Sequence, residues 1–129
     1  MFFVGIDIAK YKHDFAIIDE HGLVIVPPKT IPNSQEGFND LLVTLSSLDR
    51  SQEIKIGLEA TGHYGSNLKA FLTKHGFNYV ELNPLKVSRF HQQISLRRTK
   101  TDKVDCIVIA QFISTKDNKA KSYHQPLYH

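Results

Sequence analysis

The chain has 129 residues, 41% of them hydrophobic, so its size and composition fit one folded domain with a real core and exclude a disordered polypeptide. Lys and Arg outnumber Asp and Glu by 16 to 13, and the resulting net charge of +3 permits a nucleic-acid partner without requiring one. A single cysteine excludes an intrachain disulfide, no basic signal segment opens the chain, and no apolar run approaches the ~18 residues of a membrane span. We therefore expect a cytoplasmic protein.

The first part of the chain predicts three sequential strands. Residues 2–8 form a short apolar run with β-branched side chains, which is typical of a buried strand. Residues 14–19 predict a second strand and residues 23–26 a third, which Pro27 and Pro28 should end. Because short turns join these strands, we expect an antiparallel meander.

The hydrophobic period then changes to that of a helix. Asn33, with Glu36 three residues later, predicts a helix N-terminus with a capping box, and apolar residues follow at helical spacing. Residues 53–59 alternate between apolar and polar side chains and predict a fourth strand. Residues 63–75 predict a second helix, which Gly76 should end.

The last part of the chain predicts one more strand and one more helix. Residues 77–82 predict a fifth strand, whereas residues 85–101 are basic and show no clear period. Residues 103–114 predict a helix that is apolar on nearly all sides and should lie buried against the sheet. We expect residues 1–115 to form the folded domain and residues 116–129 to be a polar tail or the start of a linker.

This order of elements predicts an α/β fold with a mixed five-stranded sheet in the order 3-2-1-4-5, flanked by helices. Strands that are separated by helices run parallel, and their crossover connections are right-handed. The first and fourth strands are then parallel neighbours. Their carboxyl ends should lie side by side.

Four carboxylates fall near this edge of the sheet. Asp7 ends the first strand and Glu59 the fourth, where the ligands of open α/β sheets bind, so the two can share a metal ion. Asp102 and Asp105 are three residues apart at the start of the last helix and share one face. Ordinary explanations stay open: a solvated strand end for Asp7, a salt bridge for Glu59 and a helix N-cap for Asp102. Asp105 is harder to explain, because its neighbours are apolar and a buried carboxylate is costly without a partner.

Taken together, the four acids predict a site for divalent metal ions. Like charges gathered at one edge disfavour ionisation, and a cation removes that cost. Ligands that offer only oxygen suit Mg²⁺ or Mn²⁺ rather than zinc. Two such ions about 3.5–4 Å apart can activate an attacking oxygen and stabilise a leaving oxygen at phosphorus.

A basic stretch leads directly into these acids. Its cations are Lys86, Arg89, Arg97, Arg98, Lys100 and Lys103. A solvated basic face is the usual explanation for such a run. Beside an acidic pocket, however, it also suits a phosphodiester, with the cations on the backbone and metal ions at the scissile phosphate. A nucleic acid is therefore the expected partner.

Other chemistries find less support in the sequence. The seven histidines make no metal-binding spacing with one another or with Cys106, and we expect most of them on the surface. Cys106 should be a small core residue. No glycine-rich phosphate loop is present, which disfavours an actin-like kinase or ATPase.

Four motifs, in order, resemble the DEDD transposases of bacterial insertion sequences, a family that includes the Piv-type DNA invertases. They are GIDIAK (5–10), LEATGHY (58–64), NPLKV (83–87) and KTDKVD (100–105). The resemblance implies an RNase H-like (RuvC-like) N-terminal catalytic domain. The family's four acids match Asp7, Glu59, Asp102 and Asp105.

The resemblance also implies an activity and partners. We expect metal-dependent DNA strand cleavage and transfer with two Mg²⁺ or Mn²⁺ ions, guided by a structured RNA. We also expect a homo-oligomeric full-length protein in the bacterial cytoplasm, associated with the nucleoid. Family members carry a second, C-terminal domain with a serine that attacks the DNA phosphate, and no residue here matches it. The alternatives are a RuvC-type Holliday-junction nuclease and a non-catalytic nucleic-acid-binding fragment.

Overall fold

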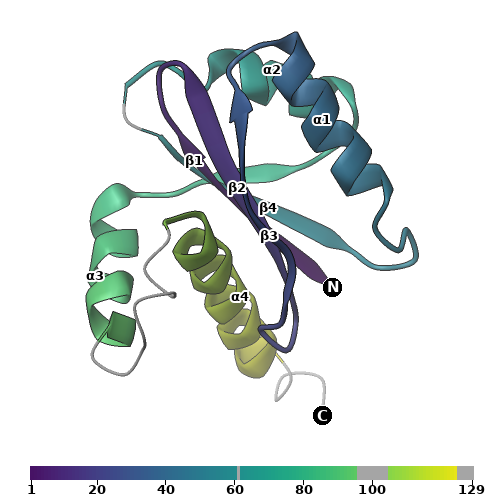
Figure 1. The fold of residues 1–129 in the computed structure, drawn as a ribbon. Coiled ribbons are helices and arrows are strands. Elements are labelled where there is room, and N and C mark those ends of the chain that lie inside the picture. The colour runs from purple at the N-terminus through teal and green to yellow at the C-terminus, as the bar shows by residue number, and fades with distance from the viewer. Residues whose placement is uncertain (61, 96–104, 125–129) are drawn as a thin grey trace.

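The structure, a computed structural model, describes residues 1–60, 62–95 and 105–124. A five-stranded mixed sheet runs through its centre in the order β3-β2-β1-β4-β5 (Figure 1). The strands are β1 (Phe2–Ile8), β2 (Lys12–Asp19), β3 (Val24–Pro32), β4 (Ile54–Ala60) and β5 (Tyr79–Glu81). β2 is antiparallel to both of its neighbours, whereas β1, β4 and β5 are parallel. The predicted strand order and directions are confirmed.

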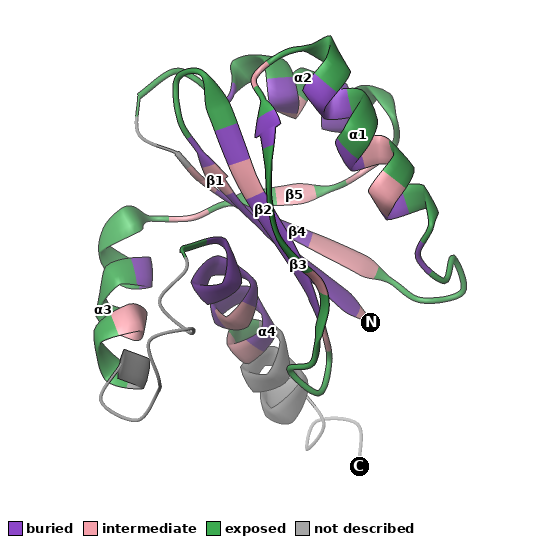
Figure 2. Ribbon diagram, in the orientation of Figure 1, coloured by how far each residue is buried: buried purple, intermediate pink, exposed green. Residues whose placement is uncertain are grey.

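Helices cover both faces of this sheet. They are α1 (Gln35–Ser46), α2 (Ser66–Lys74), α3 (Pro84–Ser95) and α4 (Asp105–His124). α1 and α2 pack on one face, and α4 packs on the other with α3 beside it (Figures 1 and 2). A hydrophobic core lies on each face of the sheet, and side chains of β1 alternate between the two. Ile6 faces α1 and α2, whereas Phe3 faces α4.

The third strand is longer than predicted. The expectation that Pro27 and Pro28 end it is wrong, since β3 continues to Pro32. β3 lies at the edge of the sheet, where a proline need not donate to a ladder. The register of β3 on β2 also shifts between Val26 and Lys29, which accommodates the two prolines in an irregularity.

The first helix has a different cap from the one predicted. Ser34, not Asn33, is the N-cap, and its hydroxyl oxygen accepts the Gly37 N–H at 3.5 Å. At the next helix the predicted stop is confirmed, because α2 is followed by Gly76 with a φ of 80°.

Two helices exceed what the sequence pattern predicted. α3 occupies the basic segment, where Pro84 begins the helix and the Asn83 side-chain oxygen accepts the Leu85 N–H at 2.9 Å. α4 continues past residue 114 to His124, because a helix can propagate through polar residues without an apolar period. The domain limit at residue 115 stays a prediction, and the helix crosses it.

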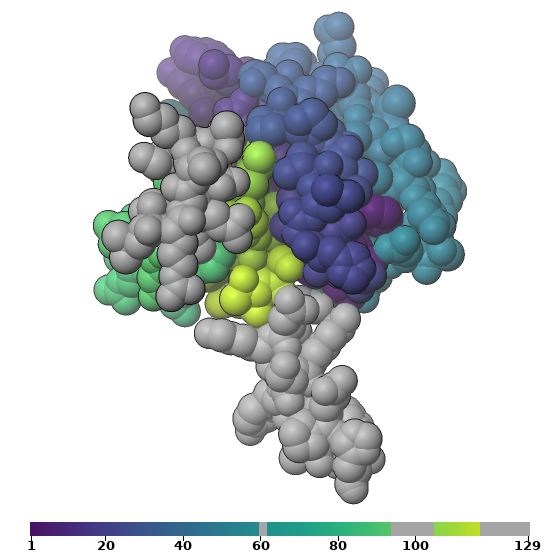
Figure 3. Space-filling model, turned by 60° about the horizontal axis from the view of Figure 1, so that its bottom comes forward, coloured from purple at the N-terminus to yellow at the C-terminus, as the bar shows by residue number. Residues whose placement is uncertain are grey.

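Small residues let α4 approach the sheet closely. Gly5 pairs with Ala16 on β2 and with Gly57 on β4, so three small residues lie in a row beneath the helix. A Cβ at Gly5 would lie 2.1 Å from the carbonyl oxygen of Cys106, which is itself fully buried as predicted. In the space-filling view α4 lies between α3 and β3 (Figure 3). This contact fixes where α4 begins.

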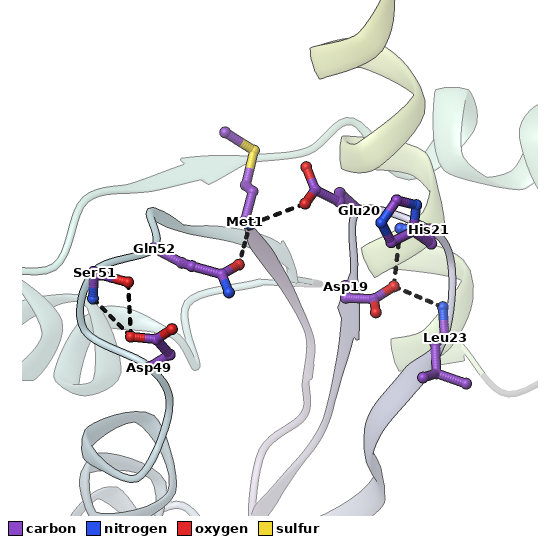
Figure 4. Close-up of polar contacts among 8 residues, drawn as sticks. All are labelled: Met1, Asp19, Glu20, His21, Leu23, Asp49, Ser51 and Gln52. Carbon is purple, nitrogen blue, oxygen red and sulfur yellow. Dashed lines mark hydrogen bonds and ion pairs between the residues drawn. The ribbon is translucent and has the colours of Figure 1, made fainter.

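The amino-terminal end of β1 is closed by polar contacts (Figure 4). The Asp19 carboxylate accepts the backbone N–H groups of His21 and Leu23, both at 2.9 Å, and so holds the β2–β3 turn. The Met1 amino group donates to Gln52 in the loop before β4. Among the described elements, no helix is long and apolar enough to cross a bilayer.

Candidate active site

Strand pairing places two of the predicted acids side by side. Asp7 on β1 is the register partner of Glu59 on the parallel strand β4. On its other side Asp7 pairs with Asp14 of β2. Register partners project from the same face of a sheet, and Gly5, two residues earlier, shows that this is the face covered by α4. Three carboxylates therefore lie in one row on the α4 side.

Asp105 brings a fourth carboxylate to this row, from the helix. It is the first residue of α4, and α4 packs across β1, β2 and β4. The expectation that Asp105 is buried is wrong, since its side chain is exposed while Cys106 and Ile107, which follow it, are buried. The helix turns those two side chains into the sheet and leaves Asp105 at the rim. Because the Asp105 carboxylate is exposed to water, it needs no partner to compensate for a loss of hydration.

The acids perturb one another. Burial raises the pKa of Asp7 to about 6, and the charges of Asp105 and Asp14 and a hydrogen bond with Asp105 add to this effect. Burial also raises the pKa of Glu59, followed by the charges of Asp7 and Asp105. The charge of Asp105 raises the pKa of both groups. We call these carboxylates, Asp7 on β1, Glu59 on β4 and Asp105 on α4, the acidic edge.

The described part of this edge is not a complete metal cage. Across residues 1–60, 62–95 and 105–124, no three His, Cys, Asp or Glu side chains converge closely enough to hold one ion. Asp102, the remaining predicted ligand, lies outside the described residues. Thr30 donates a hydrogen bond to Asp14 at 2.6 Å, so Asp14 already has a neutral partner.

A family model for IS110-type DEDD transposases matches residues 4–127 of this chain. The chain belongs to this transposase family. Two relatives agree with it. The pilin gene-inverting protein of Moraxella lacunata is 30% identical over 117 residues, which are 90% of this chain and 35% of the relative. A protein of the IS117 mini-circle from Streptomyces coelicolor is 31% identical over 125 residues, 97% of this chain and 29% of the relative. The chain thus spans about a third of the length of these relatives.

Solved structures identify the fold of this family member. The chain is similar to Thermus thermophilus RuvC, with a TM-score of 0.52 and 14% identity over 85% of this chain and 91% of RuvC. RuvC in complex with a Holliday junction substrate gives the same TM-score at 13% identity, over 85% of this chain and 90% of that one. The predicted RNase H-like, RuvC-like fold is confirmed.

The basic segment of this transposase domain is only partly described. Lys86 and Arg89 lie on α3 and are exposed, because Val87 and Phe90 occupy the side of the helix that packs against α4. The other predicted cations lie outside the described residues; they are Arg97, Arg98, Lys100 and Lys103.

His13 is an exception among the histidines, most of which are predicted to be on the surface; His21, His63 and His75 are exposed. Its side chain is fully buried on β2, where Nδ1 accepts the Ala9 N–H at 3.4 Å and the ring stacks on Phe38 with centroids 6.2 Å apart. Burial lowers the pKa of His13. The period of two along β2 could have revealed it, since His13 is in phase with the core residues Phe15 and Ile17.

Asn33 connects the two loops that follow the acid-bearing strands. Its Nδ2 donates to the carbonyl oxygens of Lys10, after β1, at 3.0 Å and of Tyr64, after β4, at 3.3 Å. Its backbone N–H donates to the Tyr11 carbonyl at 2.9 Å. The sequence predicts a different role for Asn33, because a cap is the common function of Asn before a helix.

A large cavity lies away from these carboxylates. It measures about 960 Å³ and opens along β5 and the start of β4, with Ile54, His75 and Tyr79 in its wall. Neither Asp7 nor Glu59 lines it. Size therefore does not identify the site in this fold; the arrangement of the carboxylates does.

Proposed function

We propose that this chain is the metal-dependent catalytic domain of a DNA transposase or recombinase. In this proposal Asp7, Glu59 and Asp105, together with Asp102, hold divalent metal ions at a scissile phosphate. The observation that carries it is the register pairing of Asp7 with Glu59 beside the first residue of α4. Membership of the transposase family supports the reaction class.

The chemistry of the acidic edge fits Mg²⁺ or Mn²⁺. Its described donors are carboxylate oxygens, which both ions prefer. The raised pKa of Asp7 and of Glu59 reflects burial and mutual repulsion, and bound cations relieve both. When bound, such ions activate the attacking oxygen and stabilise the leaving oxygen at phosphorus, and a pair of them can do both.

The chain's own residues orient the substrate around that edge. Asp7 and Glu59 are held by β1 and β4, whose pairing leaves them little freedom to separate. Lys86 and Arg89 are exposed on α3, which packs against α4, so they are available to phosphates of a DNA strand that reaches Asp105. We include Arg97, Arg98, Lys100 and Lys103 in the same DNA-binding surface.

The finer parts of the proposal concern a longer protein. They are DNA strand cleavage and transfer, guidance by a structured RNA, homo-oligomerisation, and a C-terminal domain that supplies a nucleophilic serine. The Moraxella relative is named for inverting a gene, which supports a reaction that rearranges DNA. This chain corresponds to 35% of that relative and carries Asp7, Glu59 and Asp105, so we assign it the metal-binding part of the reaction.

A thermal-unfolding experiment tests the metal site in this chain. Mg²⁺ or Mn²⁺ should raise the melting temperature of the wild type, because a ligand at a hundredfold excess over Kd stabilises the folded state by about 2.7 kcal/mol. Asp7→Asn and Glu59→Gln should each remove most of this rise. Asp40→Asn, which changes an exposed carboxylate on α1, is the matched control and should keep it. A wild type without any metal-dependent rise, or an Asp7→Asn variant with a full one, would refute the proposal.

A further inference from the structure

Two tyrosines are exposed beside the acidic edge. Tyr11, 75% exposed, lies in the turn between β1 and β2, shortly after Asp7. Tyr64, 41% exposed, lies in the loop between β4 and α2, shortly after Glu59. Six phenylalanine rings of the described residues, such as that of Phe15, are by contrast buried in the core. An exposed ring forgoes the stabilisation of burial, so two of them beside one site suggest a ligand with an apolar face.

The backbone holds these tyrosines in a fixed relation to each other and to the acids. The Nδ2 of Asn33 donates hydrogen bonds to the carbonyl oxygens of Lys10 and Tyr64, and its backbone N–H donates to the carbonyl oxygen of Tyr11. The Tyr64 loop also packs onto the end of β1, where a Cβ at Gly65 would lie 2.9 Å from the Ile8 side chain. Both loops lie at the same end of the sheet (Figure 1).

A cation accompanies the first ring. The Lys10 ammonium lies 5.0 Å from the centroid of the Tyr11 ring, within cation–π range. A ring face next to an ammonium is the combination by which proteins hold single-stranded nucleic acid, since the base stacks and the phosphate pairs with the charge. A duplex offers no such base face, because its bases are already stacked on one another.

The acids explain why aromatic contacts are needed here. A Lys or Arg placed against Asp7 and Glu59 would pair with those carboxylates, whereas a tyrosine ring stays free to bind a base. Stacking also positions a nucleotide without relying on its phosphate, which the carboxylates repel until cations are bound. We propose that Tyr11 and Tyr64 form a stacking surface for an unpaired base of the DNA strand that enters the acidic edge. This inference rests on the proposed function.

The experiment separates stacking from charge. The probes are a fluorescein-labelled thymidine oligomer of about 12 nucleotides, within the usual span of single-strand sites, and an abasic oligomer with the same phosphates. Binding to this chain is measured by fluorescence anisotropy without divalent metal. The wild type should bind the thymidine oligomer roughly tenfold more tightly than the abasic one, in line with the energy of stacking one base. Tyr11→Leu and Tyr64→Leu should each reduce this preference.

Matched variants control for folding and for nonspecific binding. Tyr11→Phe and Tyr64→Phe keep the ring and should keep the preference. Leu23→Ala removes an exposed apolar side chain at the opposite end of the sheet and should change neither affinity. Thermal melts of every variant verify that it is folded.

The inference is overturned if the wild type binds the thymidine and abasic oligomers with equal affinity, or if both leucine variants keep the full preference for the thymidine oligomer. It is also overturned if a uridine RNA oligomer binds more tightly than the thymidine oligomer and this binding depends on the tyrosines. Melts with Mg²⁺ on the same proteins keep the two proposals apart. If Mg²⁺ raises the melting temperature but the wild type shows no preference for the thymidine oligomer, the stacking proposal alone is refuted. If the wild type prefers the thymidine oligomer but Mg²⁺ does not raise its melting temperature, the metal-site proposal alone is refuted.

Discussion

Asp7 lies between two other carboxylates, because strand pairing places Glu59 on one side of it and Asp14 on the other. Burial and the neighbouring charges make the ionised form of such an acid less stable than it would be in water, and so raise its pKa. The free energy of unfolding of the metal-free chain should therefore depend on the protonation state of this one group.

We predict that Asp7→Asn stabilises the metal-free fold at neutral pH. The folded-state pKa of Asp7, about 6, is above the ordinary value of 3.8, so the folded state binds the proton more tightly. The contribution is present at low pH and is lost as pH rises from about 4 through 6. It amounts to less than about 3 kcal/mol, since the carboxylate keeps part of its solvation. Urea unfolding of both proteins at several pH values measures it; a variant less stable than wild type at pH ~7 would contradict the prediction.

His13 should produce a pH dependence of the opposite sign. Burial holds its pKa below the ordinary 6.5, so the folded state keeps it neutral while the unfolded chain takes up a proton. Stability is then lost as pH falls below about 6.5, down to the folded-state pKa. The difference between the pH profiles of wild type and His13→Gln isolates this loss from carboxylate titration. Parallel profiles between pH ~6.5 and ~5 would count against a neutral buried His13.

The contact between β1 and α4 decides where Asp105 lies. Gly5 permits it, because any Cβ there would meet the backbone of Cys106 and of Ala110, at 2.1 and 2.5 Å, rather than a flexible side chain. At Gly57 the nearest obstacles are side-chain atoms, of Ile113 at 2.8 Å and of Leu82 at 3.1 Å, and no backbone atom. The two positions are register partners, and they differ in what an added methyl group would displace.

We therefore predict that Gly5→Ala destabilises the fold by about 3 kcal/mol or more, and Gly57→Ala by about 1 kcal/mol. Because α4 must shift in the first variant, its Mg²⁺-dependent rise in melting temperature should shrink as well. Gly22→Ala is the control for backbone strain alone, since Gly22 has a φ of 83° and open space around it. Denaturant unfolding ranks the three variants, and equal losses of stability at Gly5 and Gly57 would contradict the prediction.

At the scale of the whole molecule, acidic and basic surfaces belong to different elements. The carboxylates lie at the ends of β1 and β4 and the start of α4, whereas Lys86 and Arg89 are exposed on α3. α3 packs against α4, which begins at Asp105, so these cations and that carboxylate lie on neighbouring helices. A DNA strand bound along α3 would be directed toward the carboxylates.

This arrangement predicts salt-sensitive DNA binding. Each phosphate contact adds about −0.9 to the slope of log affinity against log salt for duplex DNA, so the pair Lys86→Ala and Arg89→Ala should flatten the slope by up to roughly two units. The pair Lys29→Ala and Lys74→Ala removes the same charge from β3 and α2 and should leave the slope nearly unchanged. Titrations at several salt concentrations measure both pairs, and identical slopes would place the DNA elsewhere.

The sequence by itself determined the strand order, the pairing of Asp7 with Glu59 and the family. Local alternation locates strands, and the rules for crossover connections leave few ways to join them, so strands one and four had to be parallel neighbours. The motifs around Asp7 and Glu59 are contiguous in the chain, which is why a resemblance could be recognised before any packing was known.

Only the tertiary structure decided the features that depend on position across the fold. β3 continues through its prolines because it lies at the edge of the sheet, and His13 is buried because α1 covers its face. Asp105 is exposed because α4 turns its neighbours inward, and Asn33 bridges two loops that are distant in sequence. None of these properties belongs to a residue and its neighbours along the chain. Each is set by which surfaces the fold brings together and which it leaves to solvent.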